Sequence, residues 1–277
     1  MSNSFQGVCY VISILQSAYY SIEYPRGLRV VVEPVHGSLK RIIDAHIAEN
    51  NLTYDDIEYL EIRGNLGNDV QIESNYHFIN EYLLNLKVLN LRYADMTTIP
   101  QAAFYRNRSI HYITLPKYLK TIGDCAFQDS ELRDVNLYLP PSVEHVGWNA
   151  FAGTQISGSV IISSRSGYIY LGRASFDSPA IFTAVFCEGV EVIDGGSPFN
   201  VYLSALVLPS SLETINYSIL HNTLIVCCYA PIPPNIADCT LLRSELVGDV
   251  LVPSGAYLLY MEETCPWSSL GIVPSLP

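Results

Sequence analysis

The residues of this chain that could bind a metal ion or act as nucleophiles are its six histidines and seven cysteines. The histidines are scattered, and the His-Glu-x-x-His pattern of a zinc-dependent hydrolase does not occur. His111 and Cys125 lie in adjoining segments, but their spacing matches no nucleophile-and-base pattern. There is no Cys-x-x-Cys pair, and an odd number of cysteines in so long a chain does not predict a disulfide framework. We therefore expect most cysteines to be small apolar core residues.

Sequence patterns for phosphate, dinucleotide and calcium binding are also absent, and so is the Gly-x-Ser-x-Gly elbow of a hydrolase. The sequence therefore predicts no catalytic residue, no cofactor and no metal ion. The enzymatic alternative that stays open is one that acts on glycans. It requires two carboxylates that converge in a cleft at roughly 5–9.5 Å.

The composition indicates a chain with a large apolar core and an acidic surface. Apolar residues make up 49% of the sequence and charged residues 15%, which is not the composition of a disordered chain. Fifteen basic residues against 27 acidic residues give a formal net charge of −12. This charge disfavours nucleic acid and anionic lipid as partners.

An apolar run covers residues 7–20, which is shorter than the ~18–20 residues that a membrane-spanning helix needs. Ser13, Gln16 and Ser17 interrupt the run, and no Lys or Arg precedes it as in a secretory signal. We interpret this run as a buried N-terminal strand, and we expect no membrane-spanning segment in the chain.

A short motif that ends in phenylalanine recurs with a period of about 23 residues, which is the signature of a repeat protein. Its copies include IPQAAF, IGDCAF, VGWNAF and LGRASF, and a degraded copy, INYSIL, ends at Leu220. One coil of a repeat cannot bury its apolar side alone, so we expect the aromatic rings to fill the space between neighbouring coils. The predicted repeat core is Phe104, Phe127, Phe151, Phe176 and Phe199.

A second element precedes most of these motifs, as in ITLPKYLKTI at 113–122, LYLPPSVEHV at 137–146 and LVLPSSLETI at 206–215. The alternation of apolar residues predicts a strand with one face turned inward, and the proline ends the strand because it cannot donate to a ladder. The glycines of the phenylalanine motifs are expected to permit a tight turn or a positive φ. These are Gly123, Gly147 and Gly172.

Together these elements predict an α/β repeat fold, a right-handed leucine-rich-repeat solenoid with one parallel sheet. Its first coil needs a cover, for which the apolar periodicity predicts helices over 39–50 and 75–84 that flank a strand at 57–62. We expect an N-terminal capping region at 1–85, the solenoid at 86–240 and a C-terminal capping unit at 241–277.

The pairing of LPxxLxxI with IGxxAF resembles the BspA-like leucine-rich repeat of bacterial surface antigens, over residues 57–277. The segments CYAPIPP at 228–234 and VLVPSGAYLLYMEETCPWSSL at 250–270 are similar to the family's closing unit. That similarity implies a short helix near 254–263 and an end sealed by Trp267. The stretch 156–172 departs from the pattern, because it lacks the Leu-Pro element.

The resemblance implies a non-catalytic, adhesin-like protein that is secreted or at the cell surface and binds a protein or glycoconjugate, with its export signal not visible in this chain. The alternative is a structural spacer, or a subunit of a surface assembly, without a ligand of its own.

Side chains that point outward from the predicted strands are the candidate binding strip. Tyrosine is enriched in such surfaces because it offers a large, rigid contact area with a polar tip. The alternative is that these tyrosines only cover the sheet or fill gaps between coils. The predicted strip comprises Tyr59, Arg92, His111, Tyr112, Arg133, Asn136 and Tyr138.

Overall fold

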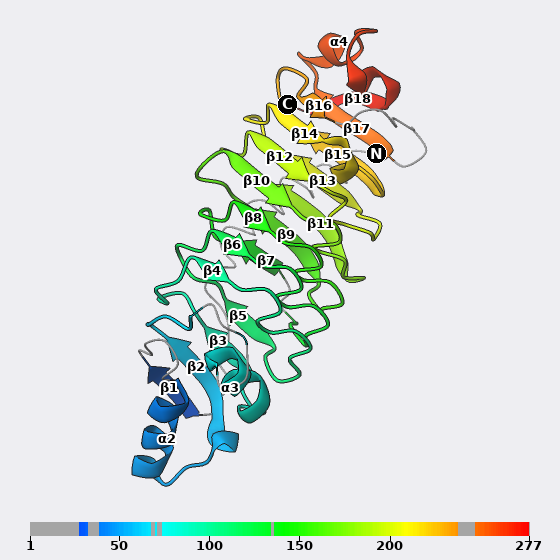
Figure 1. The fold of residues 1–277 in the computed structure, drawn as a ribbon. Coiled ribbons are helices and arrows are strands. Elements are labelled where there is room, and N and C mark those ends of the chain that lie inside the picture. Colours follow the sequence, from blue (N-terminus) through cyan, green and yellow to red (C-terminus); the bar gives the residue numbers. More distant parts are fainter. Residues whose placement is uncertain are drawn as a thin grey trace.

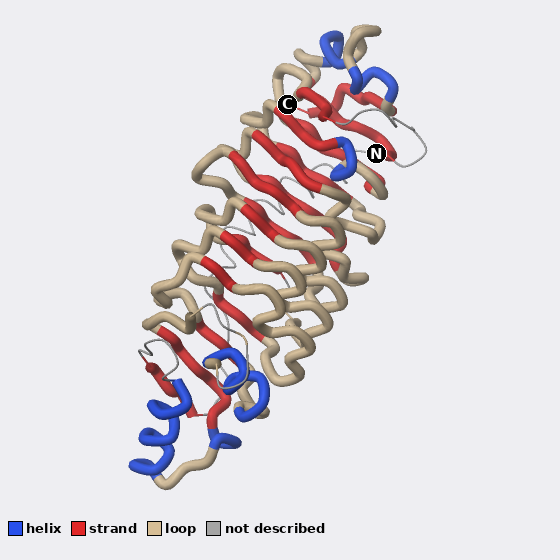
Figure 2. Tube along the Cα trace, in the orientation of Figure 1, coloured by secondary structure: helices blue, strands red, loops and turns tan. Residues whose placement is uncertain are grey.

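A computed structural model describes residues 28–32, 39–67, 70, 74–133, 136–237 and 247–276 of the chain. Within these ranges the chain winds into a solenoid with its strands stacked in rows, and its α-helices lie toward the two ends (Figures 1 and 2). The solenoid expected from the sequence is therefore confirmed. The predicted N-terminal strand at 7–20 lies outside the described residues.

Two long parallel sheets run along the solenoid, and a shorter parallel sheet lies at its N-terminal end (Figure 1). Sheet A contains the first strands of the chain, in the order β1 (Leu28–Val32), β2 (Ile57–Ile62), β3 (Val88–Asn90) and β5 (Tyr112–Thr114). Sheet C contains the Leu-rich strands of the later coils, in the order β7 (Asn136–Leu139), β9 (Gly158–Ile162), β11 (Ile181–Phe186), β13 (Ala205–Leu208), β15 (Thr223–Cys228), β17 (Val247–Pro253) and β18 (Gly271–Leu276).

Sheet B is a second face of the solenoid, whereas the sequence predicted one sheet only. It forms because the short segment before each turn repeats at the coil period, so its backbone groups meet their equivalents in the next coil. Its strands are β4 (Thr98–Ile99), β6 (Thr121–Ile122), β8 (His145–Val146), β10 (Tyr168–Leu171), β12 (Val192–Gly195), β14 (Thr214–Asn216) and β16 (Asn235–Ala237).

The core between the faces contains a column of five stacked phenylalanine rings. Adjacent ring centroids lie 4.9–5.6 Å apart, with interplanar angles of 9–22°. The backbone N–H of each ring residue from Phe104 to Phe176 donates to a carbonyl of the next coil, at 2.7–3.0 Å. We call this set the phenylalanine column, and all five side chains are fully buried: Phe104, Phe127, Phe151, Phe176 and Phe199.

The glycines of the turns have a different role from the one expected. None of Gly123, Gly147 and Gly172 has a positive φ; instead the left-handed conformation occurs two residues later, as at Cys125 and Asn149. A β-carbon on each glycine would lie only 2.5–2.7 Å from a backbone nitrogen of the preceding coil. Glycine is therefore required here for close approach between coils.

The N-terminal end of the core is covered by α2 (Leu39–Asn50) and α3 (Asn75–Tyr82), while the short helix η2 (Tyr54–Asp56) leads into β2. Ser74 caps α3, because its hydroxyl oxygen accepts a hydrogen bond from the His77 backbone N–H at 3.1 Å. The buried Asn75 side chain ties the cap together, accepting from the Leu39 N–H and donating to the Leu66 carbonyl. Tyr76 packs edge-on against Phe104 and so closes the phenylalanine column.

The C-terminal end is closed by an aromatic pair. Trp267 lies in the short helix η6 (Pro266–Ser269) and Tyr260 ends the helix α4 (Tyr257–Tyr260), and their buried rings meet edge to face. The Trp267 indole N–H donates to the Pro234 carbonyl at 2.6 Å, and the Tyr260 hydroxyl donates to the Ala230 carbonyl at 2.9 Å. The structure thus places Trp267 at the sealed C-terminal end, as the resemblance implied. The preceding helix α4 is shorter than the expected helix near 254–263. Another short helix, η3 (Tyr217–Ile219), lies in the degraded INYSIL copy.

Replacing Gly123 by alanine is expected to lower the free energy of unfolding by about 1–3 kcal/mol, the usual cost of overpacking. The added methyl group would meet the backbone of residues 100–101 in the preceding coil. Gly255→Ala is the matched control, because a β-carbon there meets nothing within 4 Å, and it should change stability by less than about 0.5 kcal/mol. Urea unfolding measures the free energy of unfolding of both variants. If the two variants lose the same free energy, glycine is not required at position 123 for close approach between coils.

Replacing Phe151 by alanine should cost about 3–5 kcal/mol, because it opens a cavity in the middle of the phenylalanine column. The exposed Phe182 provides the control, with an expected cost below about 1 kcal/mol. Thermal melting of the two variants compares these effects, and a similar melting temperature for both would show that the column does not stabilise the solenoid.

Candidate functional site

A charged row crosses the N-terminal ends of the first strands of the solenoid. Lys87 N–H donates to the Glu58 carbonyl, His111 N–H to the Lys87 carbonyl and Arg133 N–H to the His111 carbonyl, at 2.8–2.9 Å. We call Glu58, Lys87, His111 and Arg133 the charged row. It holds His111 and Arg133 of the predicted strip one strand spacing apart.

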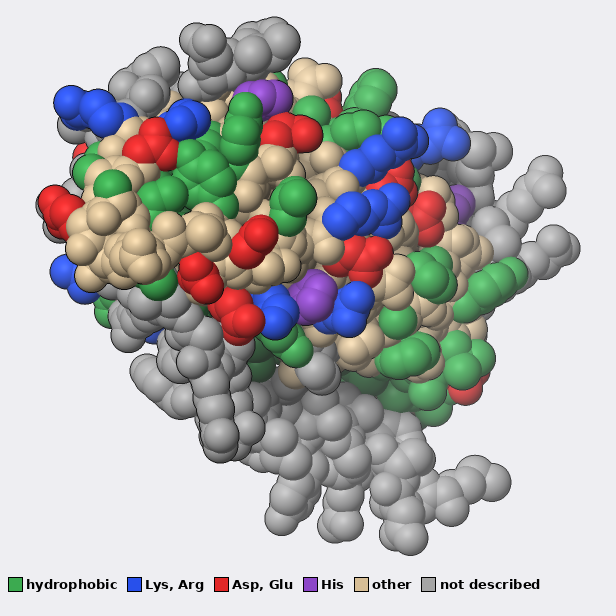
Figure 3. Space-filling view, turned by 90° about the horizontal axis from the view of Figure 1, so that it is seen from below, with side chains coloured by type: hydrophobic (Ala, Val, Ile, Leu, Met, Phe, Trp, Pro, Cys, Tyr) green, Lys and Arg blue, Asp and Glu red, His purple; other side chains and the backbone are tan. Residues whose placement is uncertain are grey.

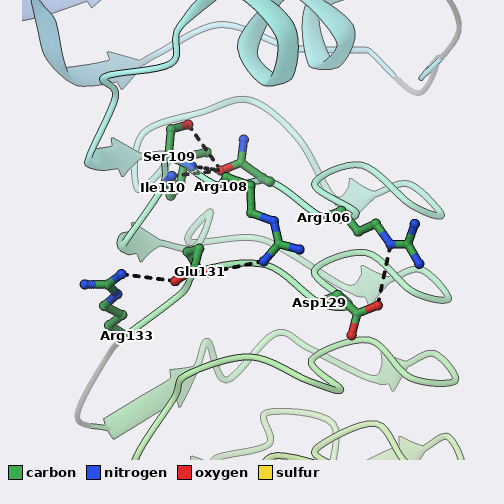
Figure 4. A network of polar contacts seen from close by, with 8 residues as sticks. Arg106, Arg108, Ser109, Ile110, Asp129, Glu131 and Arg133 are labelled. Atoms are coloured by element: carbon green, nitrogen blue, oxygen red, sulfur yellow. Dashed lines mark hydrogen bonds and ion pairs between the residues drawn. The ribbon is translucent and has the colours of Figure 1, made fainter.

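The charges of this region are largely compensated by neighbours of opposite sign. Glu131 forms ion pairs with Arg133 at 3.0 Å and with Arg108 at 3.2 Å, and Arg106 lies 3.8 Å from Asp129 (Figure 4). Figure 3 likewise shows basic and acidic side chains interspersed on the face seen from below. Exposed pairs of this kind contribute little free energy, so they do not by themselves indicate a ligand site.

Two pKa values respond to this arrangement. The hydrogen bond from Arg133 holds the pKa of Glu131 below its ordinary value, and Arg108 acts in the same direction. Partial burial lowers the pKa of His111, and the nearby Arg133 and Lys87 charges lower it further. Both effects disfavour the charged form of His111, whereas the Glu131 carboxylate acts in the opposite direction.

Tyr59 does not contribute to an open strip, contrary to the prediction. Strand alternation places it on the outer face of sheet A, but its side chain is only 2% exposed. Its hydroxyl group accepts a hydrogen bond from the Asn90 amide at 2.9 Å and donates to the buried Glu61 carboxylate at 3.3 Å. Arg63 pairs with the same carboxylate at 2.8 Å. The period of a strand tells which face a residue takes, but not whether that face is covered.

The other members of the predicted strip lie in separate places. Tyr112 is half-buried beside His111, with the two rings nearly perpendicular. Asn136 accepts a hydrogen bond from the Ser159 N–H at 3.1 Å, while the exposed Arg92 lies against the ring of Tyr93. Tyr138 packs on the outer face of sheet C. The structure thus brings together His111, Tyr112 and Arg133 but does not make one site of all seven residues.

Sheet C carries an apolar row on the face that points away from the core. Strand register places its members side by side across all seven strands. This row was not predicted from the sequence, although apolar runs such as those in β9 and β15 are typical of strands covered on both faces. We call it the outer apolar row; its members are Tyr138, Ile161, Val185, Val207, Cys227, Leu251 and Val273.

Sheet B and the turn after β8 carry a group of partly or largely exposed aromatic side chains on two adjacent coils. His145 and Tyr170 are register partners in β8 and β10, and their rings stack in parallel with centroids 4.7 Å apart. Tyr168 is 38% exposed and donates to Asp194 at 3.2 Å. Trp148 is 60% exposed, and its ring lies so close to Gly172 that a β-carbon there would approach its Cδ1 atom to 2.8 Å. We call His145, Trp148, Tyr168 and Tyr170 the aromatic patch.

The aromatic patch has the composition of a protein-binding site. Trp, Tyr and Arg are the residue types that carry most binding energy in interfaces, and the exposed Arg173 directly follows Gly172. Asp124 and Asp194 bring negative charge to the patch, since they accept hydrogen bonds from the Trp148 backbone N–H and the Tyr168 hydroxyl. Trp148 lies within one of the repeated sequence motifs, but sheet B, whose strand β8 leads into the turn that carries Trp148, was not predicted.

The described ranges contain no group of three or more His, Cys, Asp or Glu side chains placed to hold a metal ion. Nor does any helix in the part of the chain that the structure describes have the length and apolarity to cross a membrane.

Comparison with known proteins identifies the repeat. Residues 97–226 match six copies of the BspA type leucine rich repeat region. A crystal structure of a leucine rich cell surface protein from Faecalibacterium prausnitzii is similar at 17% sequence identity, with 83% of this chain and 68% of that chain covered and a TM-score of 0.31. The comparison with curated proteins gave no match.

The lowered pKa of His111 predicts a loss of stability on acidification. The unfolded chain takes up this proton near the ordinary pKa of 6.5, before the folded chain does. Stability is therefore fully present above that pH and is lost as the pH falls from 6.5 toward the folded pKa. A ring-proton NMR titration should give a midpoint below 6.5 that rises in Arg133→Gln. A midpoint at or above 6.5 in the unmodified chain contradicts this prediction.

Proposed function

Because residues 97–226 form a BspA-type leucine-rich repeat region, we propose that this chain is a non-catalytic recognition protein that is secreted or at the cell surface and binds another protein. The observation that carries the proposal is the aromatic patch, with a mostly exposed tryptophan and two stacked rings. The family resemblance supports the extracellular location, and an adhesin-like role follows from both.

The scaffold holds the aromatic patch rigid before any partner arrives. Asp124 accepts a hydrogen bond from the Trp148 backbone N–H, which positions the backbone there, and one edge of the ring lies close to Gly172. Stacking fixes His145 and Tyr170 against each other on paired strands. Side chains that are already ordered lose little conformational entropy on binding, which raises the affinity that a given contact area can reach.

Charge indicates the kind of partner. The chain carries a formal net charge of −12, and Asp124 and Asp194 adjoin the aromatic patch. An interface with this surface is most favourable for a protein patch that presents Arg or Lys, since such groups pair with the carboxylates and stack on the indole face of Trp148.

The test is a binding screen of the purified chain against extracellular-matrix proteins and mucins, with surface plasmon resonance as the readout. Replacing Trp148 and Tyr170 by alanine is expected to weaken the interaction by roughly 30-fold or more, because one hot-spot truncation costs about 2 kcal/mol. Tyr202→Ala is the matched control, since this tyrosine is 81% exposed but lies in the segment that leads into β13.

Two outcomes would contradict the proposal. If binding is lost in a Tyr112→Ser/Tyr138→Ser variant but survives in Trp148→Ala/Tyr170→Ala, the site lies on the Leu-rich strands and not on sheet B. If no protein binds the chain, a structural spacer without its own ligand becomes the better interpretation.

A further inference from the structure

Several coils carry an exposed basic side chain shortly after their strands in sheets A and C. One such cation stands within three residues of the ends of β2, β3, β5 and β9. Two of the cations are followed at once by an exposed tyrosine, in the dipeptides Arg92-Tyr93 and Lys117-Tyr118. We call this set the basic ridge; its members are Arg63, Arg92, Tyr93, Lys117, Tyr118 and Arg165.

Hydrogen bonds between neighbouring coils hold the members of the basic ridge in a row. The Lys117 N–H donates to the Arg92 carbonyl at 3.3 Å, and the Ser142 hydroxyl group donates to the Lys117 carbonyl at 3.0 Å. Farther along the row, the Arg165 N–H donates to the Pro141 carbonyl at 2.7 Å. At the other end, the pairing of β2 with β3 adds one more coil. Neighbouring coils lie about 4.8 Å apart, so the four spacings from the first cation to the last make the row about 19 Å long.

The two tyrosines stand among the cations. The Cζ atoms of Arg63 and Arg92 lie 6.0 Å and 5.9 Å from the centre of the Tyr93 ring. The Lys117 ammonium group lies 5.1 Å from the centre of the Tyr118 ring. Such contacts restrain side chains that are otherwise long and flexible. Both rings keep more than half of their surface exposed, so one ligand can touch a ring and a cation together.

The middle coils are positive although the chain as a whole is acidic. Residues 85–173 contain nine basic and six acidic residues, whereas residues 174–277 contain one basic and ten acidic residues. Glu188, in the loop after β11, lies three coils beyond Lys117, which is about 14 Å. This exceeds the Debye length of about 8 Å at physiological ionic strength. The acidic later coils therefore do little to weaken the positive field at the centre of the basic ridge.

Few carboxylates compete for the cations of the basic ridge. Glu61 pairs with Arg63 at 2.8 Å, whereas the ion pairs among the described residues include neither Lys117 nor Arg165. The exposed Asp95 is a second carboxylate that follows β3 in the sequence. Four cations against two carboxylates leave a net positive charge for an anionic ligand.

We propose that the basic ridge binds a linear anionic polysaccharide, one that carries sulfate or carboxylate groups along its chain. The cations recur from coil to coil, so they can pair with anionic groups that recur along a polymer. The exposed tyrosines offer aromatic faces, on which the C–H groups of a pyranose ring pack favourably. The basic ridge is a second binding surface, separate from the aromatic patch that carries the proposed protein-binding function.

An acidic peptide fits the basic ridge less well than a glycan. The Lys117 and Arg165 N–H groups are already bonded to carbonyls of neighbouring coils, so an extended peptide gains no main-chain hydrogen bonds from them. It would also lose conformational entropy at each ordered residue, whereas a chain of pyranose rings is stiffer and loses less. The choice of a glycan over a nucleic acid rests on the secreted or cell-surface location proposed above.

Surface plasmon resonance of the intact chain on immobilised heparin, at physiological ionic strength, tests the proposal. We expect heparin to bind and neutral dextran not to bind. Arg92→Gln/Lys117→Gln should weaken heparin binding by roughly tenfold, because two exposed cation contacts are lost. Arg106→Gln/Arg108→Gln is the matched control, since it removes the same charge before β5 instead of after it (Figure 4), and it should leave the affinity unchanged. Absence of heparin binding, or an equal loss in the two variants, overturns the proposal.

A second variant distinguishes a glycan site from a general polyanion site. Tyr93→Ala/Tyr118→Ala keeps the charge and is expected to weaken heparin binding by roughly fivefold, because the ring faces are lost. Equal melting temperatures would show that both variants stay folded. An unchanged affinity in this variant, or tighter binding of polyglutamate or oligothymidylate than of heparin, overturns the assignment to a glycan. The assay contains no protein partner, so its result is independent of the screen that tests the aromatic patch.

Discussion

The rest of this structure depends on how closely two neighbouring coils can approach. Paired parallel strands lie about 4.8 Å apart, and at the turns this spacing leaves no room for a β-carbon that points toward the next backbone. Gly123, Gly147 and Gly172 meet the requirement because they have none. Two residues later a left-handed residue such as Cys125 redirects the chain. Each turn can then donate backbone hydrogen bonds to the coil that follows it.

Close stacking also determines the kind of core that the solenoid can have. Coils in register bring equivalent side chains above one another, so one phenylalanine in each coil becomes a column of parallel rings. Such a column is open at both ends, and exposed ring faces there would cost free energy. Tyr76 closes one end edge-on, and burial raises the pKa of its hydroxyl group well above the ordinary value. Trp267 and Tyr260 close the C-terminal end of the solenoid core.

The two sheets that result differ in what their outer faces can do. Sheet B keeps aromatic side chains accessible, and the rigid coils beneath hold Trp148 and the His145–Tyr170 pair in place. Sheet C presents a continuous apolar row that is almost completely buried. One solenoid thus has two outer faces of different chemistry, an aromatic one on sheet B and an aliphatic one on sheet C. The difference between the two faces comes from their side chains, because sheets B and C have the same backbone arrangement of seven parallel strands.

The sequence by itself determined the solenoid, its period, the phenylalanine column and the sealing tryptophan, because each is encoded in short-range spacing that recurs from coil to coil. The positions of α2 and α3 were also predictable from local apolar periodicity. Only the tertiary structure decided that Thr121–Ile122 and its equivalents pair into sheet B, since that pairing joins residues about 24 positions apart. It also decided that Tyr59 is buried and Trp148 exposed. Alternation along a strand assigns a side chain to a face, but whether that face meets water depends on what packs over it, and no local pattern contains that information.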